Sequence, residues 1–132
     1  MKHILQTLIA IGLLDAFTPV QAASLDGKAI FCLERSLTSP EALGFEFFSD
    51  TVKAHKITGY SIIEEYAAKF REIGAEQVFW RGLQNTRVSL NRATLELRIA
   101  QAELYKCEVS SNEMIKSKLQ AIIDAAKKKN KI

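Results

Sequence analysis

The chain has 132 residues, the length of one domain, and carries 18 Lys and Arg against 15 Asp and Glu, a net charge of +3. That charge is too small to single out nucleic acid as a partner. Apolar residues make up 48% of the chain, with only two Pro and six Gly, so the composition excludes a disordered or collagen-like chain and allows a hydrophobic core.

The N-terminal segment has the layout of a secretory signal peptide. A short basic start at 1–3 precedes an apolar stretch at 4–14, and Pro19 and small residues then lead to Ala22. The apolar stretch falls well short of the roughly 20 residues needed to cross a bilayer, which argues against a membrane anchor. We expect cleavage after Ala22, leaving residues 23–132 as a single exported domain, soluble in the periplasm or secreted.

Cys32 and Cys107 are the only two cysteines, and both follow the expected cleavage point. In an oxidising compartment an even pair in a small domain indicates a disulfide, and the alternative is two separate buried thiols. A redox-active pair is disfavoured because the Cys-x-x-Cys spacing is absent. The bridge would join the first strand of the domain to the last, as expected for a sheet that closes on itself.

Most of the chain after Ala22 carries the patterns of β-strands. The expected strands are 29–33, 44–48, 51–57, 77–81, 86–90, 93–99 and 103–109. Two-residue hairpin turns are expected at 49–50 and 91–92. The sequence therefore predicts a mainly β fold, an antiparallel meander, small barrel or sandwich of about seven to nine strands.

Segment 62–73 has conflicting signals. Its apolar residues fall at helical spacing, Ser61 and Glu64 form a capping box, and Gly74 could end a helix. The strands expected on both sides favour an extended segment instead. The alternative fold is therefore α+β, with an additional helix at about 62–73.

The C-terminal segment predicts an amphipathic helix at 111–128. Ser110 and Glu113 form a capping box at its start. The apolar face consists of Ile115, Leu119, Ile122 and Ala126. This face either packs over one face of the sheet or projects away from it, which would leave part of the sheet exposed.

The positive charge of the chain is concentrated in this helix and its tail. Residues 111–132 contain six lysines against two acidic residues, whereas residues 23–110 are close to neutral. The tail lysines are Lys127, Lys128, Lys129 and Lys131. They either complement the helix dipole in water or contact an anionic surface, such as lipid headgroups or a polysaccharide.

The sequence contains no recognisable catalytic or metal-binding constellation. His55 is the only histidine after the cleavage point, and we expect it on the surface without an acidic partner. Glu64 and Glu65 are adjacent and point apart, which does not suit paired acid–base chemistry. There is no phosphate-binding loop, nucleophile elbow or metal-ligand spacing. We therefore expect a protein that is not an enzyme and has no cofactor or metal.

Consecutive aromatic residues give the most suggestive functional signal. Phe47-Phe48 and Phe79-Trp80 lie in expected strands, so each pair points to opposite faces of the sheet. One member of each pair is exposed unless the helix covers it. The candidate binding residues are Phe48, Phe79, Trp80, Arg81 and Arg87, with Phe79 and Trp80 as apolar anchors.

Several short motifs spread over the chain support this fold. They are Leu-Asp-Gly-Lys-x-x-x-Cys (25–32), Gly-Phe-x-Phe (44–47), Val-Phe-Trp (78–80), Leu-Asn-Arg-x-Thr-Leu-x-Leu (90–97) and Tyr-x-Cys-Glu (105–108). Together they resemble small exported bacterial proteins, many of them marine, that have no assigned activity. The resemblance implies a β-meander in which 66–73 is extended, and it favours a strand over a helix there.

The functional expectation is an exported binding or inhibitor-like module that presents an aromatic and arginine surface to an envelope protein or polymer. Two alternatives remain open. One is a carrier of a small apolar ligand inside a barrel, and the other is a peripheral membrane protein attached through the lysine-rich helix.

Overall fold

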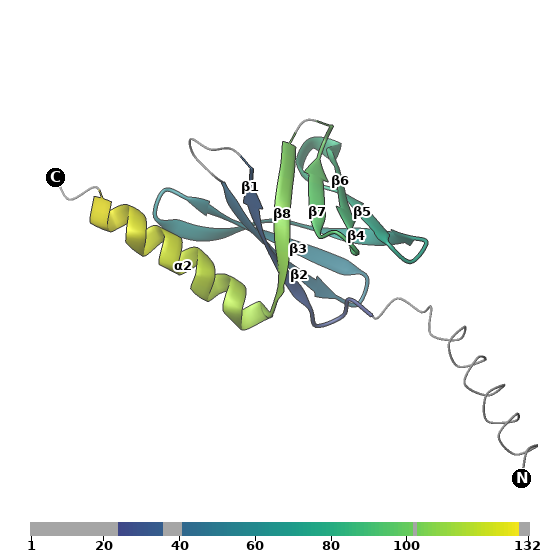
Figure 1. Cartoon of the computed structure of the whole chain (residues 1–132), viewed down its shortest axis with the longest axis horizontal. Helices are drawn as coiled ribbons and strands as arrows, with labels where there is room; N and C mark the ends of the chain where they lie inside the picture. The colour runs from purple at the N-terminus through teal and green to yellow at the C-terminus, as the bar shows by residue number, and fades with distance from the viewer. Residues whose placement is uncertain (1–23, 36–40, 102, 130–132) are drawn as a thin grey trace, which may run out of the picture.

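The structure is a computed structural model that describes residues 24–35, 41–101 and 103–129. Its strands are β1 (Ala29–Glu34), β2 (Ala42–Phe48), β3 (Thr51–Thr58), β4 (Ser61–Ile73), β5 (Gln77–Arg81), β6 (Arg87–Asn91), β7 (Glu96–Ile99) and β8 (Glu103–Ser110). Each strand pairs antiparallel with the next, and β8 pairs with β1 to close a barrel (Figure 1). The expected mainly β fold is confirmed. The expected signal peptide, 1–22, lies outside the described residues.

The barrel interior is a packed core. In β5, Val78 and Trp80 are buried while their neighbours along the strand are not, which is the alternation of a strand with one face inward. The largest side chains that fill the interior are Phe45, Phe47, Trp80 and Tyr105. The Trp80 ring lies 5.3 Å from that of Phe45 and 5.9 Å from that of Phe47, centroid to centroid. Such packed aromatic residues account for much of the buried apolar area.

Segment 62–73 belongs to the long strand β4, so the alternative of a helix there is wrong. The strand pairs with β3 on one side and with β5 on the other, and Tyr66 and Phe70 pack against the core. The register with β3 shifts between Ala54 and His55, which leaves Glu65 as the extra residue of a bulge. The bulge interrupts the two-residue alternation once, and Ala67 and Ile73 are apolar residues at exposed positions, so the strand pattern of this segment is obscured.

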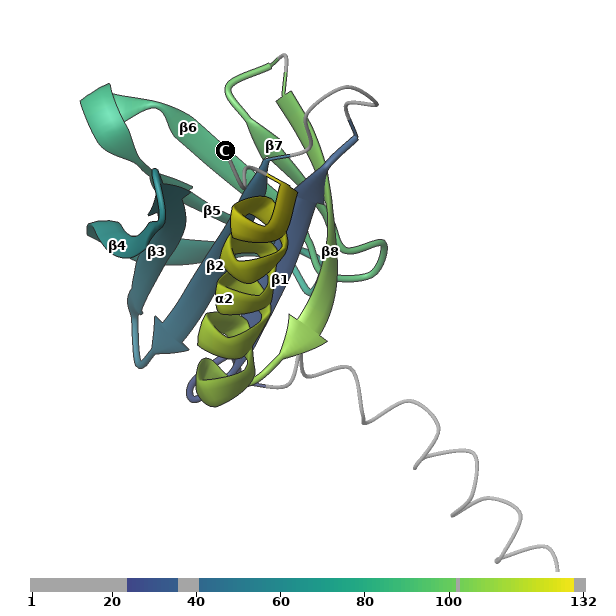
Figure 2. The same ribbon diagram turned by 90° about the vertical axis from the view of Figure 1, so that its left-hand side faces the viewer.

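Helix α2 (Asn112–Lys129) lies along the outside of the barrel, over β1 and β2 (Figure 2). Of the two arrangements that the sequence left open, the structure has the helix packed against the sheet. Ile115 and Leu119 are buried as expected, but the third buried residue is Ile123, whereas Ile122 is 36% exposed. A Cβ at Gly44 would lie 3.3 Å from Ile115 Cδ1 and 3.5 Å from Leu119 Cδ1, so the absent side chain lets the helix approach β2 closely.

Two of the differences from the expected boundaries arise because side chains bond to the backbone locally. The N–H of Met114 donates to Ser111 Oγ, so Ser111 caps the helix, and Ser110 ends β8 instead. After β6, the side chain of Asn91 accepts bonds from the N–H groups of Ala93 and Thr94. This turn delays the start of β7 to residue 96, three residues later than expected.

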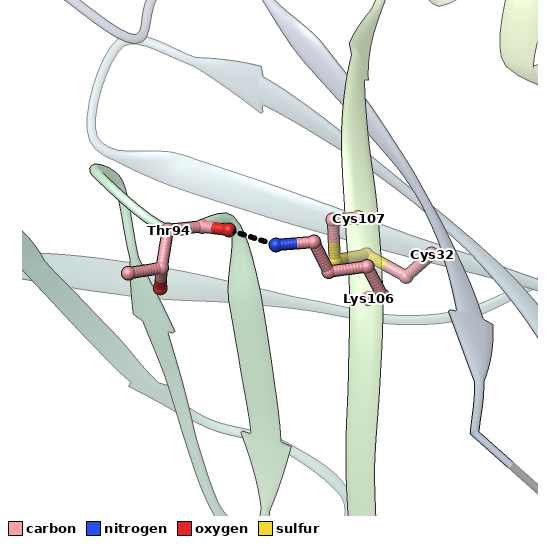
Figure 3. Close-up of a disulfide and its surroundings, with 4 residues drawn as sticks. All are labelled: Cys32, Thr94, Lys106 and Cys107. Atoms are coloured by element: carbon pink, nitrogen blue, oxygen red, sulfur yellow. Dashed lines mark hydrogen bonds between the residues drawn. A yellow bond between two sulfur atoms is a disulfide. The ribbon is translucent and has the colours of Figure 1, made fainter.

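The expected disulfide is confirmed, and the alternative of two separate thiols is wrong. Cys32 of β1 and Cys107 of β8 occupy directly opposite positions in the register and form the bond shown in Figure 3. The ammonium of the adjacent Lys106 donates a hydrogen bond to the carbonyl oxygen of Thr94 in the β6–β7 turn. The bridge and this bond join the strands on both sides of the closing seam. In the described part of the chain, no helix has the length and apolarity required to cross a membrane.

Candidate functional site

Trp80 does not serve as an exposed anchor, and the expectation that it contacts a partner is wrong. Its side chain points into the barrel and is 1% exposed. The indole N–H donates a 2.9 Å hydrogen bond to the hydroxyl of Tyr66 on β4. Burial raises the pKa of Tyr66, although its hydrogen bond with Trp80 acts in the opposite direction. The indole therefore has its polar partner inside the protein.

Phe79, the neighbour of Trp80, points outward and is half-buried. The guanidinium carbon of Arg87 lies over its ring, 4.8 Å from the centroid, which is the geometry of a cation–π contact. Phe48 is exposed at the end of β2, where the ammonium of Lys53 lies 5.4 Å from its ring centroid. The structure therefore leaves Phe48 and Phe79 accessible.

Phe79, Arg81 and Arg87 share one open hollow on the outside of β4, β5 and β6. Its volume is about 520 Å³, and Lys69 and Arg71 of β4 also line it. We name it the cationic hollow after its four cations. The structure thus brings three of the five predicted binding side chains together on this outer face, whereas Phe48 does not line the hollow.

Strand register explains how the cations meet. Arg81 of β5 is directly opposite Arg87 of β6, and Arg71 of β4 is directly opposite Phe79. Directly opposite side chains in antiparallel strands have Cβ atoms about 5 Å apart, and like charges at such positions destabilise the sheet. The Arg81–Arg87 pair is therefore a local conflict that a bound anion would relieve.

Carboxylates do not neutralise the cationic hollow. Within the described residues, none lines it, and Arg71, Arg81 and Arg87 form no ion pair. Lys69 lies 4.0 Å from Asp50, but both side chains are mostly exposed, so the pair contributes little. Arg81 Nη1 also donates a 3.4 Å hydrogen bond to the carbonyl oxygen of Asn85, which leaves its charge without a carboxylate partner. The hollow therefore presents a positive charge that the described carboxylates do not balance.

Sequence reasoning missed Lys69 and Arg71. Both lie in the segment with conflicting helix and strand signals, and a helix would have pointed them in different directions. As strand residues two positions apart, they share the outer face of β4. Once the segment is assigned to a strand, the two-residue spacing of Lys69 and Arg71 predicts that they lie on the same face.

The lysines of the helix end form a separate surface. Lys127, Lys128 and Lys129 are exposed, and the Lys127 ammonium lies 5.7 Å from the Tyr60 ring centroid. Lys131 lies outside the described residues. These lysines lie in the last turn of α2, where cations complement the helix dipole.

His55 is not the exposed, unpartnered residue expected from the sequence. Its side chain and that of Glu46 are each 8% exposed, and His55 Nε2 lies 3.0 Å from Glu46 Oε2. His55 is opposite Gly44, which α2 covers, so the pair lies on the outside of the barrel beside the helix contact. Across the described residues, no cluster of three or more potential metal ligands forms around it or elsewhere.

Comparisons with protein-family models, curated proteins and solved structures found no significant match. The resemblance to small exported bacterial proteins therefore stays a prediction.

Proposed function

We propose that the chain is an exported, non-enzymatic binding module that takes an anionic polymer of the cell envelope on its cationic hollow. The observation that carries the proposal is the Arg81–Arg87 pair, two like charges directly opposite each other with no carboxylate between them. Lys69 and Arg71 extend the same charge across the neighbouring strand. A polymer with repeated carboxylate or sulfate groups could neutralise several of these cations at once.

An acidic polymer suits this surface better than a protein partner does. Protein interfaces rely on desolvated aromatic anchors, and Trp80, the largest candidate, is buried and hydrogen-bonded. A single-stranded nucleic acid would need rings on which its bases could stack. Phe79 is the only aromatic side chain exposed in the hollow, and the guanidinium of Arg87 already lies over it. Charge is therefore the dominant feature left for recognition.

The disulfide supports the exported location in this proposal. Bonds such as Cys32–Cys107 form and persist in oxidising compartments such as the bacterial periplasm. The intact mass of protein from an expressing bacterium, with and without reduction and alkylation, tests this. We expect the mass to show that residues 1–22 have been removed and that the thiols are alkylated only after reduction. An uncleaved chain with two free thiols would contradict export.

The polymer proposal is tested by binding to immobilised heparin and polygalacturonate, with uncharged dextran as the reference. The Arg81→Gln/Arg87→Gln variant is compared with wild type between about 50 and 200 mM salt. We expect wild type to bind both acidic polymers and the variant to elute at clearly lower salt. The salt dependence of its affinity should also decrease, because it forms fewer ion pairs with the polymer.

Lys116→Gln/Lys128→Gln is the matched control, since it removes the same charge from exposed positions of α2. It should bind the polymers nearly as well as wild type. Equal losses in both variants would mean that only net charge matters. A loss confined to the helix variant would transfer the binding to the lysine-rich helix, as the peripheral-membrane alternative predicts.

A further inference from the structure

A second hollow lies beside the cationic hollow on the outside of the barrel, over the neighbouring strands β5, β6 and β7 (Figure 1). Its volume is about 230 Å³. Every side chain that lines it is polar, and we name it the polar hollow after these residues: Gln77, Ser89, Asn91, Thr94, Glu96 and Arg98. Its one carboxylate and its one guanidinium balance each other, so the polar hollow has no net charge.

Strand register places the two hollows next to each other. Phe79, which lines the cationic hollow, is directly opposite Ser89, which lines the polar hollow. Opposite side chains in antiparallel strands have Cβ atoms about 5 Å apart. Gln77 lies two residues from Phe79 and therefore points to the same outer face of β5. A single extended ligand can thus contact both hollows at once.

The β6–β7 turn fixes the orientation of one polar group. The carboxamide oxygen of Asn91 accepts hydrogen bonds from the N–H groups of Ala93 and Thr94. Both bonds use the oxygen, so the amide NH₂ of Asn91 is left to donate to a ligand. Asn91 is directly opposite Gln77 on one side and Glu96 on the other. Two amides and a carboxylate therefore form one row across the three strands.

The other side chains of this row also keep their hydrogen-bonding capacity for a ligand. Across the described ranges of the chain, the side chains of Gln77, Ser89 and Glu96 bond to no other protein group. Lys106 is directly opposite Glu96 on β8, but its ammonium donates to the carbonyl oxygen of Thr94. The polar hollow thus offers both donors and acceptors, whereas the charged side chains of the cationic hollow are donors only.

This mixture of groups suits the hydroxyls of a sugar. A hydroxyl donates one hydrogen bond and accepts others, so it can bond to amides, to a carboxylate and to a guanidinium. An anionic group does not suit the polar hollow, because the carboxylate of Glu96 would repel it. The polar hollow therefore favours an uncharged, hydroxyl-rich unit, and the cationic hollow beside it favours an anionic one.

We propose that the anionic polymer is a polysaccharide with uncharged sugar units between its charged ones. The charged units pair with the cations of the cationic hollow. Beyond the Phe79–Ser89 pair, an uncharged unit bonds through its hydroxyls to Gln77, Ser89 and Asn91. This inference rests on the proposed function, since it names the class of polymer and adds a second hollow to the same site.

The probe is a hyaluronan oligosaccharide, in which charged glucuronate alternates with uncharged N-acetylglucosamine. The reference is an oligoglutamate with the same number of carboxylates, which lacks sugar hydroxyls. Titration calorimetry of the disulfide-bonded protein at one fixed salt concentration measures both affinities. We expect wild type to bind hyaluronan about tenfold more tightly than oligoglutamate, because only hyaluronan bonds to the polar hollow.

Gln77→Ala/Ser89→Ala removes two hydrogen-bonding side chains without changing the charge. It should lower the affinity for hyaluronan about tenfold and leave the affinity for oligoglutamate unchanged within about twofold. Ser117→Ala/Gln120→Ala is the matched control, since it removes the same residue types from exposed positions of α2. The control should change neither affinity.

Glu96→Gln provides a second measure of the same site. It removes the carboxylate that keeps anions out of the polar hollow, so it should tighten oligoglutamate more than hyaluronan. Because both probes carry the same number of carboxylates, the ratio of their affinities is insensitive to the change in net charge. We expect this ratio to fall about threefold.

The outcomes separate the two proposals. Equal affinity of wild type for the two probes, or a preference that survives in Gln77→Ala/Ser89→Ala, would overturn the polysaccharide assignment alone. Equal losses in the α2 control would do the same. Binding of heparin without binding of hyaluronan would also leave the anionic-polymer proposal standing. If wild type bound none of these polyanions, both proposals would be wrong.

Discussion

Trp80 and Phe79 are adjacent in β5, yet the indole N–H of Trp80 bonds to the Tyr66 hydroxyl inside the barrel while the Phe79 ring lies outside under the Arg87 guanidinium. The alternation of the strand assigns the larger aromatic to the core and the smaller one to the surface. The exposed residue of the pair therefore contributes to a charged hollow and does not form an apolar anchor.

Tyr66 and Tyr105 make the stability of the fold sensitive to alkaline pH. Burial raises the pKa of Tyr66, and burial together with nearby carboxylates, including Glu41, raises that of Tyr105. Tyrosines in the unfolded chain lose their protons near pH 10, when the folded chain still holds these two. The unfolded state then binds fewer protons, so the free energy of unfolding falls as pH rises above about 10. Urea unfolding at about pH 9 and 11 measures the fall in the free energy of unfolding, and phenolate absorbance reports when the tyrosines lose their protons. A Tyr66→Phe/Tyr105→Phe variant should show a smaller fall.

Removing the disulfide should reduce stability substantially. The bond closes a loop with a sequence separation of 75 residues, which corresponds to roughly 4 kcal/mol in the chain-entropy account. The Cys32→Ala/Cys107→Ala variant should lose about that much free energy of unfolding, measured by urea titration. Adding reductant to this variant should have no further effect. A loss below about 1 kcal/mol would mean that strand pairing alone constrains the two ends.

Filling Gly44 should displace the helix. Gly44→Val places atoms where Ile115 and Leu119 pack, and overpacking of this kind costs about 1–3 kcal/mol. Ala67→Val, which adds the same kind of bulk at an exposed position of β4, should change stability by less than about 0.5 kcal/mol. Urea unfolding compares the two variants, and limited proteolysis of α2 reports whether the helix detaches. Equal stability of the two variants would contradict close packing at Gly44.

Removing one member of the buried Glu46–His55 pair should lower the free energy of unfolding far more than replacing both members with apolar residues. His55→Ala leaves the Glu46 carboxylate buried without its partner and should lower the free energy of unfolding by about 3 kcal/mol. Glu46→Met/His55→Leu, which removes both polar groups, should stay within about 1 kcal/mol of wild type. Additive losses in a double-mutant cycle would show that the two side chains are not coupled.

Local patterns predicted much of this fold because they follow directly from strand and helix periodicity. The alternation in β5 and the hairpin at Ser49-Asp50 required only neighbouring residues. The pairing of Cys32 with Cys107 followed from there being only two cysteines. These features depend on short segments or on counting, so no tertiary information was needed.

The missed features depend on how strands far apart in sequence meet. The bulge at Glu65 and the exposed apolar residues of β4 obscured its strand pattern, so the sequence did not show that Lys69 and Arg71 share a face with Phe79. The partner of His55 comes from another strand and is set by register. Which member of a pair such as Phe79-Trp80 points inward also depends on register, because a shift of one residue reverses the faces.

Closure of the barrel through β1 and β8 means that the first strand lacks one of its neighbours until the last strand has been made. A chain that ends before β8 would leave β1 and β7 as open edges, each offering unpaired N–H and C=O groups to another molecule. Fragments of this domain should therefore associate with one another rather than persist as smaller soluble units. Pairing of the final strand with β1 therefore removes both open edges and allows the domain to remain a monomeric barrel.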